Sequence, residues 1–191
     1  AEGAASEISS ILGRMRELAV ESSSEVLQAT ERAYLETEFD ALQAEAERIA
    51  QATEFNGLNL TDGTTTEVAV QVGIFNVAAE DRITVGLTAL DTTNLAVNSS
   101  AISVSTVSGA QASITAIDTA IDSLNSARAT YGANQNALTS SIRNLENYTE
   151  NMVEAESRIR DVDFAEATAS MTRNQIFQQA GLSVLSQANS S

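Results

Sequence analysis

Apolar residues recur at helical spacing along the first fifty residues of the chain. A helix turns about 100° per residue, so one face of a helix over 4–22 would collect Ile8, Ile11, Leu12, Met15 and Ala19. Arg14, Leu18 and Glu21 would then form a stripe on one shoulder of that face, which we expect to be exposed. A turn at 22–26 precedes a second predicted helix over about 29–53. Its apolar positions have the alternating spacing of four and three residues that is typical of a coiled coil: Leu35, Phe39, Leu42, Ala46 and Ile49.

The middle of the chain changes to a period of two. Apolar and polar residues alternate around Val68, Val70 and Val72, and again around Ile83, Val85 and Leu87. This alternation predicts strands with one buried face. Residues 58–106 are rich in Thr, Val, Asn and Ser and are interpreted as a small β region with hairpins. Before them, Asn56-Gly57 predicts a left-handed turn.

A long helix is predicted from Gly109 onward, unbroken at least over 112–155. An apolar residue recurs every seven positions: Ile117, Leu124, Tyr131, Leu138, Leu145, Met152 and Ile159. The two N-terminal helices are the expected partners along this helix. A companion series has the same seven-residue spacing and is apolar only in part: Ile114, Ile121, Arg128, Gln135, Ile142, Thr149 and Glu156. Its interruption by Arg128 and Gln135 indicates either a partly exposed stripe or polar contacts that set the register. Gly132 in mid-helix predicts a close-packed neighbour.

A last helix is predicted to about residue 188, with an apolar side that nothing else in the chain is free to cover. The predicted fold class is mainly α: an elongated antiparallel helical bundle, a coiled-coil-like rod, with a small β-hairpin region. We expect four segments: N-terminal rod helices over 1–53, a variable β-hairpin region over 54–108, a long rod helix over 109–160, and a C-terminal segment over 161–191.

Composition removes several kinds of function. The chain has 191 residues, a formal net charge of −16 and no Cys, His, Trp or Pro, and all ten of its basic residues are arginine. The negative charge disfavours binding to nucleic acid or to an acidic membrane, and no long apolar run predicts a membrane span. The usual zinc, copper and haem ligands are missing, so no metal and no cofactor is expected. The carboxylates scatter along helix surfaces without indicating a catalytic pair, so no catalytic residue is proposed and the chain is not expected to be an enzyme.

Three stretches resemble bacterial flagellin: AEGAASEISSILGRMRELAVESS at the start, ERIAQATEFNG after it, and the long run from ARATYGANQNALTSS through SRIRDVDFA to QQAGLSVLSQAN. The resemblance covers nearly the whole chain except about 58–105. It implies a structural subunit of the flagellar filament that self-assembles for motility. It also implies export through the flagellar type III apparatus without a cleaved signal peptide, and a location in the extracellular filament. The chain does not begin with Met and starts inside a predicted helix, so we expect a core fragment that lacks the family's first terminal segment and its extreme C-terminus.

The implied partners are other flagellin subunits, a flagellar export chaperone, the filament cap and junction proteins, and the flagellin-sensing Toll-like receptor of animals. A hook–filament junction protein of similar architecture is the alternative, although RMRELAVES and QQAG-x-SVL favour flagellin. An enzyme would need a catalytic set within 58–105, and that segment contains no nucleophile–base pair or metal-ligand set.

The resemblance also implies receptor contacts at particular positions and chaperone binding by the C-terminal segment, within which we select the contact residues. For the receptor, the family's contact positions fall on Arg14, Leu18, Glu38 and Ile121. For the export chaperone, which holds the terminal region as helices, the residues are Met171, Ile176, Leu182 and Leu185.

Overall fold

The computed structural model describes residues 1–160 and 164–189, so the first three and last two residues of the predicted segment 161–191 lie outside the described residues. The structure is 69% helical and also contains two small antiparallel sheets. It divides into two compact units, residues 1–142 and 143–191, which are described separately. The predicted fold class, a mainly α helical bundle with a small β-hairpin region, is confirmed.

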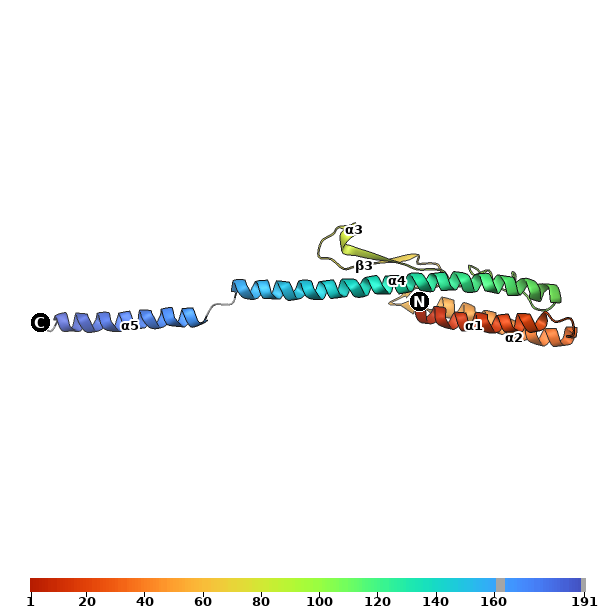
Figure 1. The fold of residues 1–191 in the computed structure, drawn as a ribbon, viewed down its shortest axis with the longest axis horizontal. Coiled ribbons are helices and arrows are strands. Elements are labelled where there is room, and N and C mark those ends of the chain that lie inside the picture. Colours follow the sequence, from red (N-terminus) through yellow and green to blue (C-terminus); the bar gives the residue numbers. More distant parts are fainter. Residues whose placement is uncertain (161–163, 190–191) are drawn as a thin grey trace. The chain divides into compact units, whose positions relative to one another are not determined.

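Three helices build the first unit: α1 (Glu2–Ser22), α2 (Ala29–Ala52) and the first part of α4 (Val107–Arg160). A capping box, in which Gln28 and Glu31 exchange side chain to backbone hydrogen bonds, starts α2. Figure 1 shows α1 and α2 side by side along the first part of α4. Ion pairs join Glu2 to Arg128 and Arg16 to Asp118, and this order means that α1 runs antiparallel to α4.

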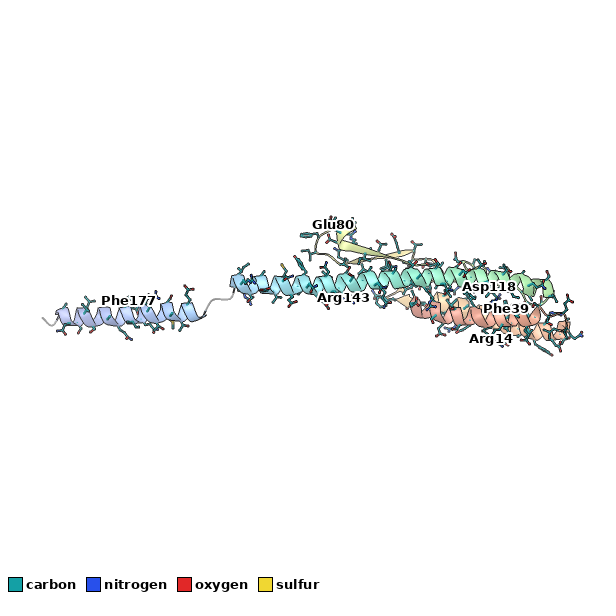
Figure 2. All side chains as sticks on the ribbon, viewed as in Figure 1. Arg14, Phe39, Glu80, Asp118, Arg143 and Phe177 are labelled. Carbon is teal, nitrogen blue, oxygen red and sulfur yellow. The ribbon has the colours of Figure 1, made fainter. Side chains whose placement is uncertain are left out.

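The helices share one apolar core. Its largest fully buried side chains on the helices are Ile8, Leu12, Met15, Leu18, Phe39, Ile117 and Leu124. Phe39, labelled in Figure 2, comes from the centre of α2. The predicted stripe of α2 therefore faces the core, with Leu35, Leu42 and Ile49 partly buried against it.

Two hairpins follow α2. Strands β1 (Glu54–Phe55) and β2 (Leu58–Asn59) pair across Asn56 and Gly57, whose φ angles of 52° and 77° make the two-residue left-handed turn that the sequence predicts. Strands β3 (Glu67–Gln71) and β4 (Arg82–Gly86) pair antiparallel around the one-turn helix α3 (Ala78–Asp81). The predicted alternation is present, but the apolar face of this second hairpin is only half-buried, and Val70 on it is 37% exposed.

The segment from Leu87 to Thr106 differs from the predicted β region, since it contains no strand. It nevertheless supplies the core with Leu90, Leu95, Val97, Ile102 and Val104. Polar bonds attach it to the helices: Ser22 donates its hydroxyl to the Val104 carbonyl at 2.5 Å, and Glu36 accepts the Ser103 hydroxyl at 2.7 Å. The segment is therefore an irregular strap over the helices.

The long helix is confirmed, since α4 runs unbroken for 54 residues. Its apolar heptad series is buried at Ile117, Leu124 and Tyr131. At Leu145 and beyond, the same series is exposed. The expectation that the N-terminal helices cover the whole length of this helix is therefore wrong. The close neighbour predicted for Gly132 is also absent from the described residues, because a Cβ added there would meet nothing within 4 Å.

The polar residues that interrupt the companion series of α4 were given two interpretations, and each one applies at a different position. Arg128 donates to Glu2 at 2.9 Å, which is a polar contact that sets the register between α4 and α1. Gln135 is exposed, which matches the interpretation of a partly exposed stripe. Both interpretations therefore hold, at different positions.

The second unit contains the rest of α4 and helix α5 (Phe164–Asn189). The large apolar residues of α5 are exposed, as expected from their lack of a partner. They do not share one side, however. At about 100° per residue, Leu182 and Leu185 lie near Met171, whereas Ile176 is about 140° away from it. The expectation of a single apolar side is therefore wrong.

Candidate interaction surfaces

The structure brings together two of the residues assigned to the receptor. Arg14 on α1 donates to the Glu38 carboxylate on α2, from Nε at 2.9 Å and from Nη2 at 2.6 Å. Its Nη1 also donates to Glu17 at 3.0 Å. The hydrogen bonds to Glu38 and Glu17 raise the pKa of Arg14 above its ordinary value. The three charged side chains are about half exposed or more, so they form an accessible charged surface across α1 and α2.

Leu18 does not lie on that exposed surface. It is completely buried, in contrast to the exposed shoulder that the sequence predicts. The reason is that α1 packs against both α2 and α4, so its buried arc is wider than a single stripe. Arg14, one turn earlier, stays exposed because its long side chain reaches out to Glu38. Ile121 on α4 is half-buried against the core.

The residues assigned to the chaperone lie on α5 in the second unit. Met171 is 56% exposed, Ile176 59%, Leu182 68% and Leu185 67%. All four are thus accessible to a partner, although Ile176 points to a different side of the helix.

Sequence reasoning missed a groove of about 350 Å³ beside α2, here called the α2 groove. Its wall is formed by Asp40, Gln43, Ala44 and Glu47 of α2, together with Thr92 and Ser99 of the strap. Residues 40, 43, 44 and 47 have the spacing of one helical face, and this spacing is the sequence feature from which one wall of the groove could have been predicted. The position of the strap could not be predicted from the sequence, because its residues follow no periodic pattern.

Glu47 holds the strap at one end of this groove. Its carboxylate accepts the Thr92 backbone N–H at 2.8 Å and the Thr92 hydroxyl at 2.7 Å. Partial burial acts to raise the pKa of Glu47, but the hydrogen bonds from Thr92 and Gln51 outweigh it, and the pKa lies below its ordinary value. Glu47 is therefore a charged structural residue whose acceptor capacity is already in use.

Two kinds of site are not found in residues 1–160 and 164–189. No group of three or more carboxylates in these ranges is arranged to hold a metal ion. Within the same ranges, no helix combines the length and the apolar character needed to cross a membrane.

Long helices packed as a bundle, with large apolar side chains exposed, are typical of a structural protein that associates with other chains. Comparison with known proteins agrees. Residues 1–66 match the bacterial flagellin N-terminal helical region, and residues 114–191 match the C-terminal helical region. The chain is 42% identical to a flagellin of Halalkalibacterium halodurans over 189 residues, which span 99% of this chain and 68% of that protein. It is 34% identical to the flagellin of Bacillus subtilis over 218 residues, covering 99% of this chain and 72% of that protein.

Solved structures give the same result. The crystal structure of Bacillus cereus flagellin matches with a TM-score of 0.63 and 33% identity, covering 81% of this chain and 86% of that one. FliC from Burkholderia pseudomallei, at 17% identity and a TM-score of 0.58, shows the shared fold alone. The chain therefore belongs to the bacterial flagellin family, a family of structural proteins of the flagellar filament.

Proposed function

We propose that this chain is a repeating subunit of the bacterial flagellar filament, exported through the flagellar type III apparatus and assembled with copies of itself outside the cell. The observation that carries the proposal is the exposed apolar side chains from residue 142 onward, on the end of α4 and on α5. On α4 from residue 142 onward, six large apolar side chains are 37–87% exposed: Ile142, Leu145, Tyr148, Met152, Val153 and Ile159. On α5, six more are 56–68% exposed: Met171, Ile176, Phe177, Leu182, Val184 and Leu185.

The energetics of these side chains favour assembly. Burying one large apolar side chain stabilises a protein by about 1.5–3 kcal/mol, and many large apolar side chains exposed together mark an interaction site. The side chains of α5 point in several directions around the helix, as expected for a helix that is covered on all sides. Packing between neighbouring copies would supply this cover. The filament cap and junction proteins would contact the same type of surface at the filament ends.

The test is filament formation by the full-length protein that carries this sequence. Leu145→Glu combined with Met152→Glu places charges in the apolar series of α4, and we expect filaments and motility to be lost in complementation. Asn144→Glu combined with Asn151→Glu adds the same charge at exposed polar positions of the same helix, and should leave filaments intact. Normal filaments from the first variant would contradict the proposal. A wild-type protein that bound hook ends without polymerising would instead support the junction-protein alternative.

We also propose that the free monomer is a ligand of the animal flagellin-sensing Toll-like receptor. The exposed Arg14–Glu38 pair supports this, because it presents charged groups from two adjacent helices at two positions that the family resemblance assigns to the receptor. Ile121, half-buried on α4, would form a supporting contact. Leu18 is buried, so its contribution would be to hold α1 in place beneath Arg14.

Receptor binding by the monomer tests this second role. Arginine is frequent among interface residues whose truncation costs about 2 kcal/mol or more, so Arg14→Ala should weaken binding by about 30-fold. Arg16→Ala is the matched control, since Arg16 lies on the same helix with similar exposure but pairs with Asp118 on α4. Equal losses for the two variants, or no binding by wild type, would contradict the assignment.

A third proposal is that α5 binds a flagellar export chaperone before export. The support is the exposure of Met171, Ile176, Leu182 and Leu185, since apolar side chains of this size need shielding while the chain is unassembled. Leu182→Glu with Leu185→Glu should abolish binding in calorimetry, whereas Thr172→Glu, on the same helix, should bind normally. Unchanged affinity of the leucine variant would refute the role of α5.

A further inference from the structure

All the sulfur of this chain belongs to three methionines, because the sequence contains no cysteine. Packing divides the three into two kinds. Met15 on α1 is completely buried in the helical core, whereas Met152 on α4 is 54% exposed and Met171 on α5 is 56% exposed. A thioether is oxidised where a dissolved oxidant can reach it. The unassembled chain therefore presents two oxidisable side chains and protects the third.

Met152 lies within the apolar heptad series of α4. Leu145 precedes it by seven residues and Ile159 follows it by seven, so the three lie near one face of the helix. Tyr148, one turn before Met152, lies near the same face. All four side chains are at least 37% exposed. Because such side chains stabilise a protein only when a partner covers them, the polarity of Met152 affects how well a partner can bind.

Met171 has similar neighbours on α5. At about 100° per residue, Leu182 and Leu185 lie near the same side of this helix as Met171, and they are 68% and 67% exposed. Leucine has no atom that a mild oxidant attacks, whereas the thioether of methionine does. In both exposed apolar sets, methionine is thus the position where oxidation can change an apolar side chain into a polar one.

The reaction needs a peroxide and no group from the protein. A lone pair of the thioether sulfur attacks one peroxide oxygen, an S–O bond forms and the O–O bond breaks. The proton on the transferred oxygen passes to the departing oxygen, so hydrogen peroxide leaves as water and an organic hydroperoxide leaves as an alcohol. The sulfur loses two electrons and the peroxide gains them. The product is a sulfoxide, which is polar and can be reduced back by methionine sulfoxide reductases.

We propose that Met152 and Met171 are modification sites at which peroxides control the association of subunits. Oxidation of the free subunit places a polar sulfoxide in each apolar set, and the oxidised subunit joins a filament much less readily. The inference rests on the proposed filament function, since neighbouring copies must cover these side chains. The same cover excludes the oxidant, so assembly protects the two methionines that the free subunit exposes.

Mass spectrometry of peptides from the full-length protein, treated with hydrogen peroxide, maps the sites. In the monomer, Met152 and Met171 should gain oxygen at least about tenfold faster than Met15, because only they are accessible. In preformed filaments, both should react about as slowly as Met15. Equal rates at all three methionines of the monomer, or equal rates at Met152 in monomer and filament, would overturn the inference.

The effect on assembly is measured as the critical concentration for filament growth, by sedimentation. Peroxide treatment of the wild-type monomer should raise it by about tenfold or more, because a polar group would be buried without a partner, and methionine sulfoxide reductase should reverse the rise. Met152→Leu combined with Met171→Leu keeps apolar side chains of similar volume, so this variant should assemble normally before and after treatment. Met15→Leu is the matched control and should remain as sensitive as wild type.

Circular dichroism separates an effect on association from an effect on folding. The treated wild-type monomer should keep its helix content, since both oxidised side chains are exposed. If the double leucine variant lost assembly after treatment as wild type does, the inference would be overturned, while untreated wild-type filaments would still support the filament function. Failure of the untreated wild-type protein to assemble would instead overturn both.

Discussion

Replacing Arg32 by methionine removes the connection between the end of α1 and the start of α2. Arg32 is 91% buried and has no carboxylate partner among residues 1–160 and 164–189. Its guanidinium instead donates to three backbone carbonyls: Ser22 at 3.0 Å, Ser24 at 2.7 Å and Leu27 at 2.7 Å. The last turn of α1 contains no basic residue, so Arg32 also supplies the positive charge that a helix C-terminus favours.

The three bonds contribute unequally to stability. A hydrogen bond to a charged group contributes about 1.5–3 kcal/mol, but the Ser24 and Leu27 carbonyls belong to a turn that water can reach. Ser22 is completely buried, and its carbonyl would lose its partner without replacement. Adding the loss of the charge at the helix end, about 0.3–1 kcal/mol, we expect Arg32→Met to lower the free energy of unfolding by about 2–4 kcal/mol.

Urea unfolding followed by circular dichroism at 222 nm measures this change. Arg32→Lys should fall between wild type and Arg32→Met, because an ammonium keeps the charge but cannot span all three carbonyls. Arg48→Met is the control on the same helix, where an exposed pair with Glu45 should contribute less than about 0.5 kcal/mol. If Arg32→Met cost no more than Arg48→Met, the assignment of Arg32 as the bond between the helices would be refuted.

Three further substitutions follow from local geometry. The folded pKa of Glu47 is lowered, so its carboxylate stabilises the fold above the ordinary pKa of about 4.3, and this stability is lost as the pH falls through the folded value. Glu47→Gln should therefore reduce stability at pH 7 and flatten its decline below about pH 4, as measured by urea midpoints across that range. Gly73→Ala should destabilise the second hairpin by about 1–3 kcal/mol, since its Cβ would lie 1.7 Å from Asp81 Oδ1. Gly132→Ala meets nothing within 4 Å and should stabilise α4 by about 1 kcal/mol; thermal melts of the two variants should shift in opposite directions.

The helices could be predicted from the sequence because their signal is periodic. The spacing of apolar residues located α1, α2 and α4 to within a few residues of their observed bounds. The burial of individual residues was predicted less accurately than the helices, because burial depends on which other elements pack against a helix. Leu18 is buried since α1 has two neighbours, and Leu145 is exposed although it continues the same series as Leu124.

Contacts made by irregular backbone were also beyond prediction. The strap supplies Val97 and Val104 to the core and forms one wall of the α2 groove, yet no period marks it. The Arg14–Glu38 pair joins residues 24 positions apart, so only the packing of α1 on α2 brings them together. The family resemblance named both residues without indicating that they touch each other.

The connection between β3 and β4, here called the tip loop, is held closed where it leaves the strands, and this affects which insertions the chain can tolerate over evolution. Both Val72 and Gly73 donate their backbone N–H groups to the Asp81 carbonyl, at 2.7 and 3.0 Å, so the two ends of the tip loop are already held together. Lengthening a loop whose ends are fixed costs only about 0.6 kcal/mol for each doubling of its length. Sequence inserted near the exposed Ile74 and Phe75 would leave the helical core unchanged. The tip is therefore the position where whole domains could be gained or lost, or a foreign peptide displayed, at little thermodynamic cost.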